Sequence, residues 1–315
     1  MYFLTLLISL FFVFSLSAEA AIPHGDGKVV VSIKPLYSLV ASVMGETGTP
    51  TLLIDKNASP HDYSLKPSEV TLIQHADMFF FVSPHFETFL QKPLGLVTKK
   101  TNLINMVESS HLALLPFRRD GDWDIHHEHI HDHDHDSARF DYHVWLDPAN
   151  AMKMVSTIER AMSHRYPANQ QQYHANAQKT IARLRLLDQR VSAELKPLHH
   201  MPYIVFHDAF HYFEKAYGIS AVGSIALEPE QPPSAQTLNA IRHKIRKLGV
   251  SCVFTEPQVN RGVINAVSEG LPIIIGQLDE QGVLLPVSPD LYFHLIENIA
   301  NEIHTCLTTP KKKRP

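Results

Sequence analysis

The stretch NQQQYHANAQKTIARLRLLDQRVSAELKPL, residues 169–198, contains no glycine, and its single proline is Pro197, near its end. Apolar residues recur along it at alternating spacings of four and three, and only Asp188 interrupts the series. The series consists of Ala177, Ile181, Leu184, Val191, Leu195 and Leu198. This period predicts one amphipathic helix, about 45 Å long at a rise of about 1.5 Å per residue. Such a helix is long enough to join two lobes rigidly; an ordinary surface helix of one domain is the alternative.

Short apolar runs alternate with helical patterns on both sides of this helix. Continuous runs such as MFFFV at 78–82 and PIIIG at 272–276 are typical of strands that a parallel sheet buries on both faces. The predicted strands are residues 29–33, 51–54, 78–82, 144–146, 203–206, 252–255 and 272–275. The expected fold is therefore α/β. We expect two lobes of mostly parallel sheets flanked by helices, at 21–168 and 199–309, joined by the long rigid helix at 169–198.

The composition excludes one class of function and indicates another. The 315 residues carry 28 Lys+Arg and 32 Asp+Glu, a net charge of −4, so the chain lacks the basic footprint of a nucleic-acid-binding protein. Hydrophobic residues make up 44% of the chain, as in proteins with packed cores. Histidine is the outlier with 21 residues, and neutral imidazole is the commonest protein ligand for metals. Metal binding is therefore the first hypothesis.

The N-terminus is typical of an exported protein. Residues 1–17 form one apolar run, and Ala18-Glu19-Ala20 supplies the small residues of a cleavage site, which predicts a signal peptide over 1–20. No Lys or Arg precedes the run, and a short membrane anchor is the alternative. Because no cysteine lies near this end, we do not expect a lipid anchor. The basic residues 310–315 are interpreted as a solvated tail.

The two cysteines, Cys252 and Cys306, agree with export. Two and only two cysteines in an exported chain are expected to form a disulfide. A pair of metal ligands is the rival interpretation, but the long separation lacks the C-x-x-C type of spacing. A disulfide that closes a loop of this size stabilises the folded state by about 4 kcal/mol, through the entropy of the unfolded chain.

A tract rich in histidine and aspartate, DGDWDIHHEHIHDHDHD, occupies residues 120–136. Its histidines are His126, His127, His129, His131, His133 and His135. We expect residues 119–139 to form a loosely ordered loop, because this composition cannot bury an apolar face. The tract would supply exchangeable secondary ligands for Zn²⁺, unless it is an unselected low-complexity insertion. The letters HEHIH at 127–131 match the H-E-x-x-H signature of zinc hydrolases by chance, since the tract lacks the amphipathic helix that the motif requires.

Three other histidines stand beside predicted strand ends and turns. His61 lies in the turn ASPHDY, His143 lies in YHVWLDP, and His207 directly follows the strand predicted at 203–206. The functional groups of α/β folds gather where strands end and helices begin. Any one of these histidines alone could have a purely structural role.

Four motifs carry a resemblance to a known family: SPHDYSLKPSEV at 59–70, DYHVWLDP at 141–148, VFHDAF at 205–210 and CVFTEPQ at 252–258. In this order, with the His/Asp-rich tract between the first two, they resemble the cluster 9 (A-1) solute-binding proteins of ABC transporters, which carry Zn²⁺ or Mn²⁺. The resemblance spans nearly all of the chain after the predicted signal peptide. It implies a periplasmic, monomeric binding protein without catalytic activity. Such a protein captures zinc between its lobes and delivers it to an inner-membrane permease with a cytoplasmic ATPase.

The resemblance also implies the metal ligands. His61, His143 and His207 fall where the family places three metal-binding imidazoles. Asp279 falls where many members supply a fourth, acidic ligand, and water is the alternative. Manganese members tend to have a carboxylate at the position of His207, so three imidazoles favour tetrahedral Zn²⁺.

Neighbouring side chains have expected secondary roles. Asp62 and Asp208 are candidates for orienting the adjacent imidazoles, or else they cap turns and helices. Glu256 could face the cleft, whereas His85 and His211 are not expected to be primary ligands. Two other functions remain open from the sequence: an exported zinc buffer without a transporter, and a zinc hydrolase.

Overall fold

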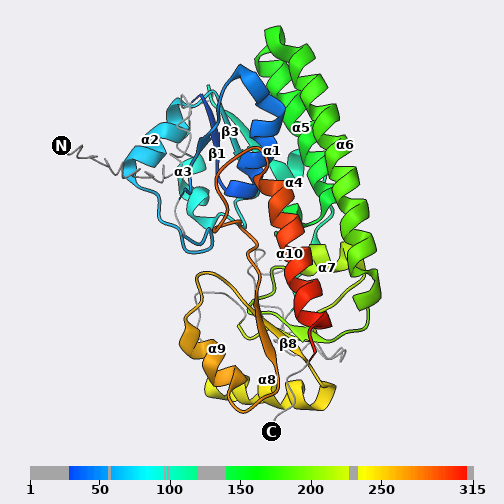
Figure 1. Cartoon of the computed structure of the whole chain (residues 1–315). Coiled ribbons are helices and arrows are strands. Elements are labelled where there is room, and N and C mark those ends of the chain that lie inside the picture. The colour runs from blue at the N-terminus through cyan, green and yellow to red at the C-terminus, as the bar shows by residue number, and fades with distance from the viewer. Residues whose placement is uncertain are drawn as a thin grey trace, which may run out of the picture.

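A computed structural model shows two lobes, one above the other in Figure 1, spanned by long helices. The structure describes residues 28–55, 58–95, 97, 100–118, 140–226 and 233–310. The predicted signal peptide at 1–20, the His/Asp-rich loop at 119–139 and the tail at 311–315 lie outside the described residues. Both lobes are built on parallel sheets flanked by helices, which confirms the predicted α/β class.

The first lobe is built on a four-stranded sheet in the order β2-β1-β3-β4, and every neighbouring pair is parallel. Its strands are β1 (Val29–Val31), β2 (Thr51–Leu52), β3 (Met78–Phe81) and β4 (Asn102–Asn105). Its helices are α1 (Lys34–Met44), α2 (Pro67–His75), α3 (Gln91–Leu94), α4 (Met106–Ser109) and α5 (Pro148–Arg165). The sheet is buried on both faces, because Phe80 joins the main core whereas Phe79 and Phe81 join a second core.

The second lobe has a three-stranded parallel sheet in the order β7-β8-β9. Its strands are β7 (Tyr203–Ile204), β8 (Cys252–Thr255) and β9 (Ile274–Gln277). Its helices are α7 (His211–Tyr217), α8 (Ala235–Leu248) and α9 (Arg261–Ser268). Phe254 joins the main core and Val253 joins the core beneath α8 and α9, so this sheet is also covered on both faces.

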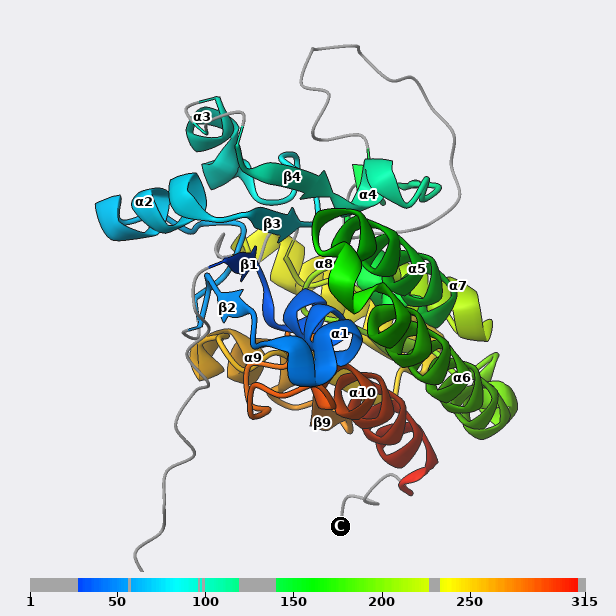
Figure 2. The same ribbon diagram turned by 90° about the horizontal axis from the view of Figure 1, so that it is seen from above.

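The predicted connecting helix is α6 (Gln170–Leu195), continued by a 3₁₀ turn at Lys196–Leu198. The residues of its predicted apolar stripe are buried, and Leu187 adds to them. A second long helix, α10 (Leu291–Thr308), packs against α6 and against α1 of the first lobe. Figures 1 and 2 show α10 running beside α6. The chain therefore crosses back to the first lobe after β9, and its last helix runs from there to the second lobe, which the sequence did not indicate.

One predicted strand was wrong, and three observed strands were not predicted. Residues 144–146, predicted as a strand, form a 3₁₀ helix, because the Asp147 side chain caps the start of α5 directly after them. The edge strand β4 was missed, since Ile104 is its only buried residue and asparagines stand at both of its ends. A short antiparallel pair, β5 (Leu115–Pro116) and β6 (Phe140–Asp141), was also missed.

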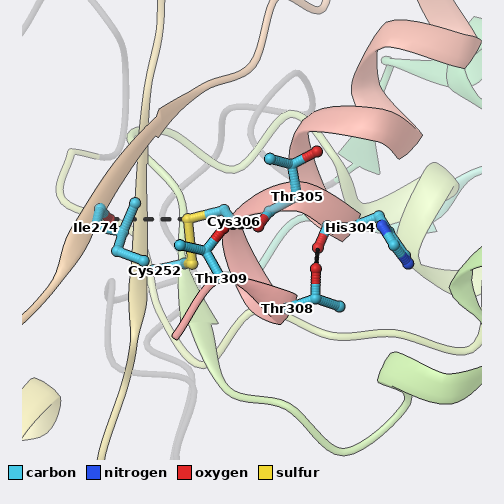
Figure 3. Close-up of a disulfide and its surroundings, with 7 residues drawn as sticks. All are labelled: Cys252, Ile274, His304, Thr305, Cys306, Thr308 and Thr309. Carbon is cyan, nitrogen blue, oxygen red and sulfur yellow. Dashed lines mark hydrogen bonds between the residues drawn. A yellow bond between two sulfur atoms is a disulfide. The ribbon is translucent and has the colours of Figure 1, made fainter. Parts of the chain in front are cut away.

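The predicted disulfide between Cys252 and Cys306 is confirmed. Figure 3 shows that it joins β8 to the last turns of α10, beside Ile274 at the start of β9. The second sheet is thus covalently tied to the end of the helix that starts beside α1 of the first lobe. Over the described ranges, no helix has both the length and the apolar character needed to span a membrane.

Candidate metal centre

His61 lies in the turn that leads from β2 to α2. Its backbone N–H donates to Ser59 Oγ at 3.2 Å, which fixes the turn around the histidine. The His61 ring lies edge-on to the ring of Phe86, with a centroid distance of 4.9 Å. The residue is partly exposed, but its Nε2 atom is buried.

His143 is held by a carboxylate two residues earlier in the chain. Asp141, the last residue of β6, accepts hydrogen bonds at Oδ1 from the His143 backbone N–H at 2.9 Å and from Nδ1 at 2.7 Å. A carboxylate acceptor requires the proton on Nδ1, which leaves Nε2 as the atom that can bind a metal. Trp145 lies against the same ring, with a centroid distance of 5.3 Å.

His207 follows β7 at the carboxyl end of the second sheet. Its Nδ1 meets Glu256 Oε1 at 2.5 Å, and its backbone N–H donates to the same oxygen at 3.3 Å. Glu256 follows directly after β8, the neighbouring parallel strand, so both residues lie at the same edge of the sheet. Glu256 therefore faces the cleft, and it orients His207 as Asp141 orients His143.

The three histidines converge although they come from distant parts of the chain. Their ring centroids lie 5.4 Å (His61–His143), 6.1 Å (His61–His207) and 5.5 Å (His143–His207) apart. One ring nitrogen from each lies within 4.8 Å of the others. Nε2 of His143 and Nε2 of His207 are buried without a hydrogen-bond partner among the described residues. Buried polar atoms are normally satisfied, so this arrangement indicates a missing ligand.

Two carboxylates lie beside His207, and one of them belongs to Glu280. Glu280 and Glu256 each place a carboxylate oxygen within 4.8 Å of a ring nitrogen of His207, and Glu280 Oε2 is buried without a partner in the described structure. Asp279 has a structural role in the loop after β9. Its carboxylate accepts from the backbone N–H groups of Val283 at 2.9 Å and Leu284 at 3.0 Å, and so shapes the loop. Asp279, and not its neighbour Glu280, was the acidic ligand expected from the resemblance.

The protonation of the imidazoles differs within the site. Burial lowers the pKa of His61 and of His143 well below the usual 6.5, and the nearby imidazoles add to this effect. Burial acts in the same direction on His207, but the charge and hydrogen bond of Glu256 outweigh it and raise the pKa of His207 to about 10. Burial, reinforced by the charge of Glu256, raises the pKa of Glu280 to about 8.

Asp62 and Asp208 do not occupy the orienting positions expected for them. Asp62 is exposed. Asp208 is buried and binds the Arg118 guanidinium, whose Nε lies 2.9 Å from Asp208 Oδ2. Arg118 Nη1 also donates to Glu214 at 2.7 Å, so Asp208 belongs to an ion cluster that joins the lobes. Asp141 and Glu256 hold His143 and His207 instead.

His85 and His211 were not expected to be primary ligands. His85 stacks on Tyr142 with a centroid distance of 5.6 Å, and neither His85 nor His211 belongs to the potential metal-binding groups of the described chain. The six histidines of the tract, His126 to His135, lie outside the described residues. The tract connects β5 to β6, and β6 ends at Asp141. The strand that follows the tract therefore ends two residues before His143.

Comparison with protein families identifies close relatives. The family model ZnuA, described as zinc-uptake complex component A, periplasmic, matches residues 29–306. The high-affinity zinc uptake system protein ZnuA of Brucella suis biovar 1 is 38% identical over 305 residues, covering 89% of this chain and 91% of the relative. The protein of the same name from Yersinia pestis is 33% identical over 288 residues, covering 89% of this chain and 91% of the relative.

Solved structures show the same fold. A crystal structure of ZnuA superposes with a TM-score of 0.74 at 23% identity, covering 89% of this chain and 98% of the other. Zn(II)-bound AdcA from Streptococcus pneumoniae gives a TM-score of 0.71 at 24% identity, covering 90% of this chain and 58% of the other.

Proposed function

Because this chain belongs to the ZnuA family of periplasmic zinc-uptake components, we propose that it binds Zn²⁺ between its lobes and hands it to a membrane transporter. One observation carries the assignment of the site. His61 and His143 of the first lobe and His207 of the second turn ring nitrogens toward one point, and two of those atoms are buried without a partner in the described chain. A cation with a preference for imidazole fills that arrangement.

The proposed coordination is three imidazoles and one carboxylate. Glu280 takes the fourth position in place of the expected Asp279, because a Glu280 oxygen is buried beside His207 while the Asp279 carboxylate accepts backbone hydrogen bonds. Three nitrogens and one oxygen suit tetrahedral Zn²⁺ at about 2.0–2.2 Å. Mn²⁺ prefers oxygen ligands, so the three imidazoles select against it.

The same coordination favours a protein that transports zinc over one that uses zinc for catalysis. Catalytic zinc keeps a position open for water or substrate, whereas four protein ligands close the coordination sphere. Asp141 and Glu256 hold His143 and His207 from behind, which is the usual support for metal-bound imidazole. A closed site with such support binds its ion tightly and releases it when the lobes move apart.

Transport requires partners beyond this chain. We expect an ABC-type permease in the inner membrane and a cytoplasmic ATPase, with the monomeric binding protein exported to the periplasm after cleavage near Ala20. A zinc buffer without a transporter would bind the metal equally well. Stimulation of the ATPase of the reconstituted permease complex by the zinc-loaded protein separates the two functions, and no stimulation would favour the buffer.

The binding site is tested by zinc titration of the purified protein in competition with a chelator. The wild type should hold one zinc tightly, and His143→Ala should lose the tight site because it removes a buried ligand and leaves Asp141 unpaired. Unchanged tight affinity in His143→Ala would overturn the assignment. The thermal unfolding of both metal-free proteins, followed by circular dichroism, controls for misfolding.

A further inference from the structure

The Glu280 carboxylate lies beside His207 and Glu256 of the second lobe, yet the backbone around it is bound to the first lobe. Residues 279–289, which we name the Glu280 segment, leave β9 and lead into α10. In the described part of the chain, the side chains outside the segment that donate hydrogen bonds to its backbone all come from residues 34–145. The segment is therefore docked on the first lobe.

Among these side chains, Lys34 donates the most hydrogen bonds to the segment. It stands at the start of α1 and is buried, with 8% of its surface exposed. Its ammonium donates to the carbonyl oxygens of Val283 at 2.9 Å and of Gly282 and Leu285 at 3.4 Å each. A buried ammonium that is satisfied by three carbonyls of one loop fixes that loop, because breaking the contact leaves a desolvated charge.

Trp145 holds Glu280 itself. The indole Nε1 donates to the carbonyl oxygen of Glu280 at 2.9 Å, and the indole ring is fully buried against His143. The next element is tied as well, since Tyr292 of α10 donates its hydroxyl to the Trp145 carbonyl at 2.6 Å. One residue thus contacts a metal-binding histidine and the backbone of the carboxylate ligand.

The other end of the segment is docked on the same helix as Lys34. Ser38 Oγ donates to the carbonyl of Pro289 at 2.7 Å and accepts from the Tyr292 backbone N–H at 2.9 Å. Between its two ends, Leu285 and Val287 pack against the main core. Hydrogen bonds therefore bind the segment near both of its ends to α1 and to the turn that carries His143, and the core shared by both lobes packs against its middle.

We infer that Lys34 and Trp145 are positioning residues that make Glu280 part of the first lobe's half of the metal site. This inference rests on the proposed function, in which Glu280 is the fourth ligand. The ligands are then divided unequally. His61, His143 and Glu280 stay together when the lobes separate, and His207 leaves with Glu256. Zinc is released from a three-ligand half-site on the first lobe after the loss of one imidazole.

A double-mutant cycle tests this coupling. Zinc affinity is measured by chelator competition for the wild type, Lys34→Met, Trp145→Phe, Glu280→Ala and the two double variants that contain Glu280→Ala. We expect Lys34→Met and Trp145→Phe each to weaken zinc binding by about tenfold when Glu280 is present, because the carboxylate loses its fixed position. Within the Glu280→Ala background each should change affinity by less than about twofold, since interacting residues are non-additive. The exposed Lys153→Met on α5 is the matched control and should bind as the wild type does.

Several outcomes would overturn the inference. Equal losses with and without Glu280 would show that Lys34 and Trp145 support the fold and not the ligand, and an unchanged affinity in both single variants would show that neither positions it. Wild-type affinity in Glu280→Ala would remove Glu280 as a ligand while leaving the three-histidine site intact. Failure of the wild type itself to bind zinc tightly would instead refute the proposed function. If Lys34→Met does not fold, Trp145→Phe carries the test alone.

Discussion

His143 and His207 are built alike but differ in charge. Both are buried, and the Nδ1 of each meets a carboxylate oxygen, at 2.7 Å from Asp141 and 2.5 Å from Glu256. Burial keeps the pKa of His143 well below 6.5, whereas Glu256 raises that of His207 to about 10. Burial also raises the pKa of Asp141 to about 7. The first lobe presents an imidazole that is ready to bind a metal, and the second presents one that must lose a proton first.

The largest effect should come from removing the protonated imidazole. His207→Ala takes away the only second-lobe ligand, so zinc affinity should fall by more than the roughly hundredfold that loss of an orienting residue costs. The remaining pH dependence between pH 7 and 9 should be shallower than in the wild type, because the group with the highest pKa among the ligands is gone. Chelator competition at several pH values measures both. A pH dependence as steep as that of the wild type would contradict the contrast between the lobes.

The wild type should show the proton competition directly. His207, with a pKa of about 10, and Glu280, with a pKa of about 8, are both protonated at pH 7 in the metal-free protein and must lose their protons to bind zinc. Each group weakens binding by up to about tenfold for every pH unit below its pKa, so affinity should rise with pH through this range. His61 and His143 are already neutral there. Calorimetry in buffers of different ionisation enthalpy should therefore detect about two protons released per zinc at pH 7. Release of no protons would contradict the difference in charge between His143 and His207.

A pair of isosteric variants compares the two carboxylates. Glu256→Gln removes the anion that holds the proton on His207, and Asp141→Asn makes the same change at His143. Each should weaken binding by about 10–100-fold at high pH through the loss of orientation. Only Glu256→Gln should also reduce the number of protons released on zinc binding. If Asp141→Asn reduced it by as much, the two imidazoles would not differ in charge.

The smallest effect should come from deleting the His/Asp-rich tract. Removal of residues 120–136 takes away six histidines but leaves the three central ones, so the tight affinity should stay within about twofold of the wild type. The weaker additional binding of zinc should disappear from the titration. Loss of the tight site in this variant would show that the tract is the main binder and that neither lobe is.

Much of the fold was predictable because its strands are buried runs. The MFFFV run gave β3 and the CVFT run gave β8, since parallel strands covered on both faces contain little besides apolar residues. The run at 144–146 is equally apolar but forms a 3₁₀ helix, because its side chains are buried directly before the Asp147 cap of α5. Local composition could not distinguish the two.

The site was predictable only in part, for a related reason. The three histidines could be named because the motifs that contain them resemble those of a family of metal-binding proteins; their positions at strand ends and turns alone left a structural role open. Asp279 and Glu280 are adjacent acids with no difference in local pattern. We infer that the hydrogen bond from Trp145 and the contacts of Lys34 place Glu280 beside His207, and those partners lie more than a hundred residues away in the sequence.

Trp145 also provides an optical reporter within the protein. The chain has two tryptophans, and the other, Trp123, belongs to the His/Asp-rich tract. The variant lacking residues 120–136 therefore contains a single indole, buried with its ring 5.3 Å from that of His143 and its N–H on the Glu280 carbonyl. Its emission would follow the arrival and departure of an ion from one side of the cleft alone, in real time and without an attached dye.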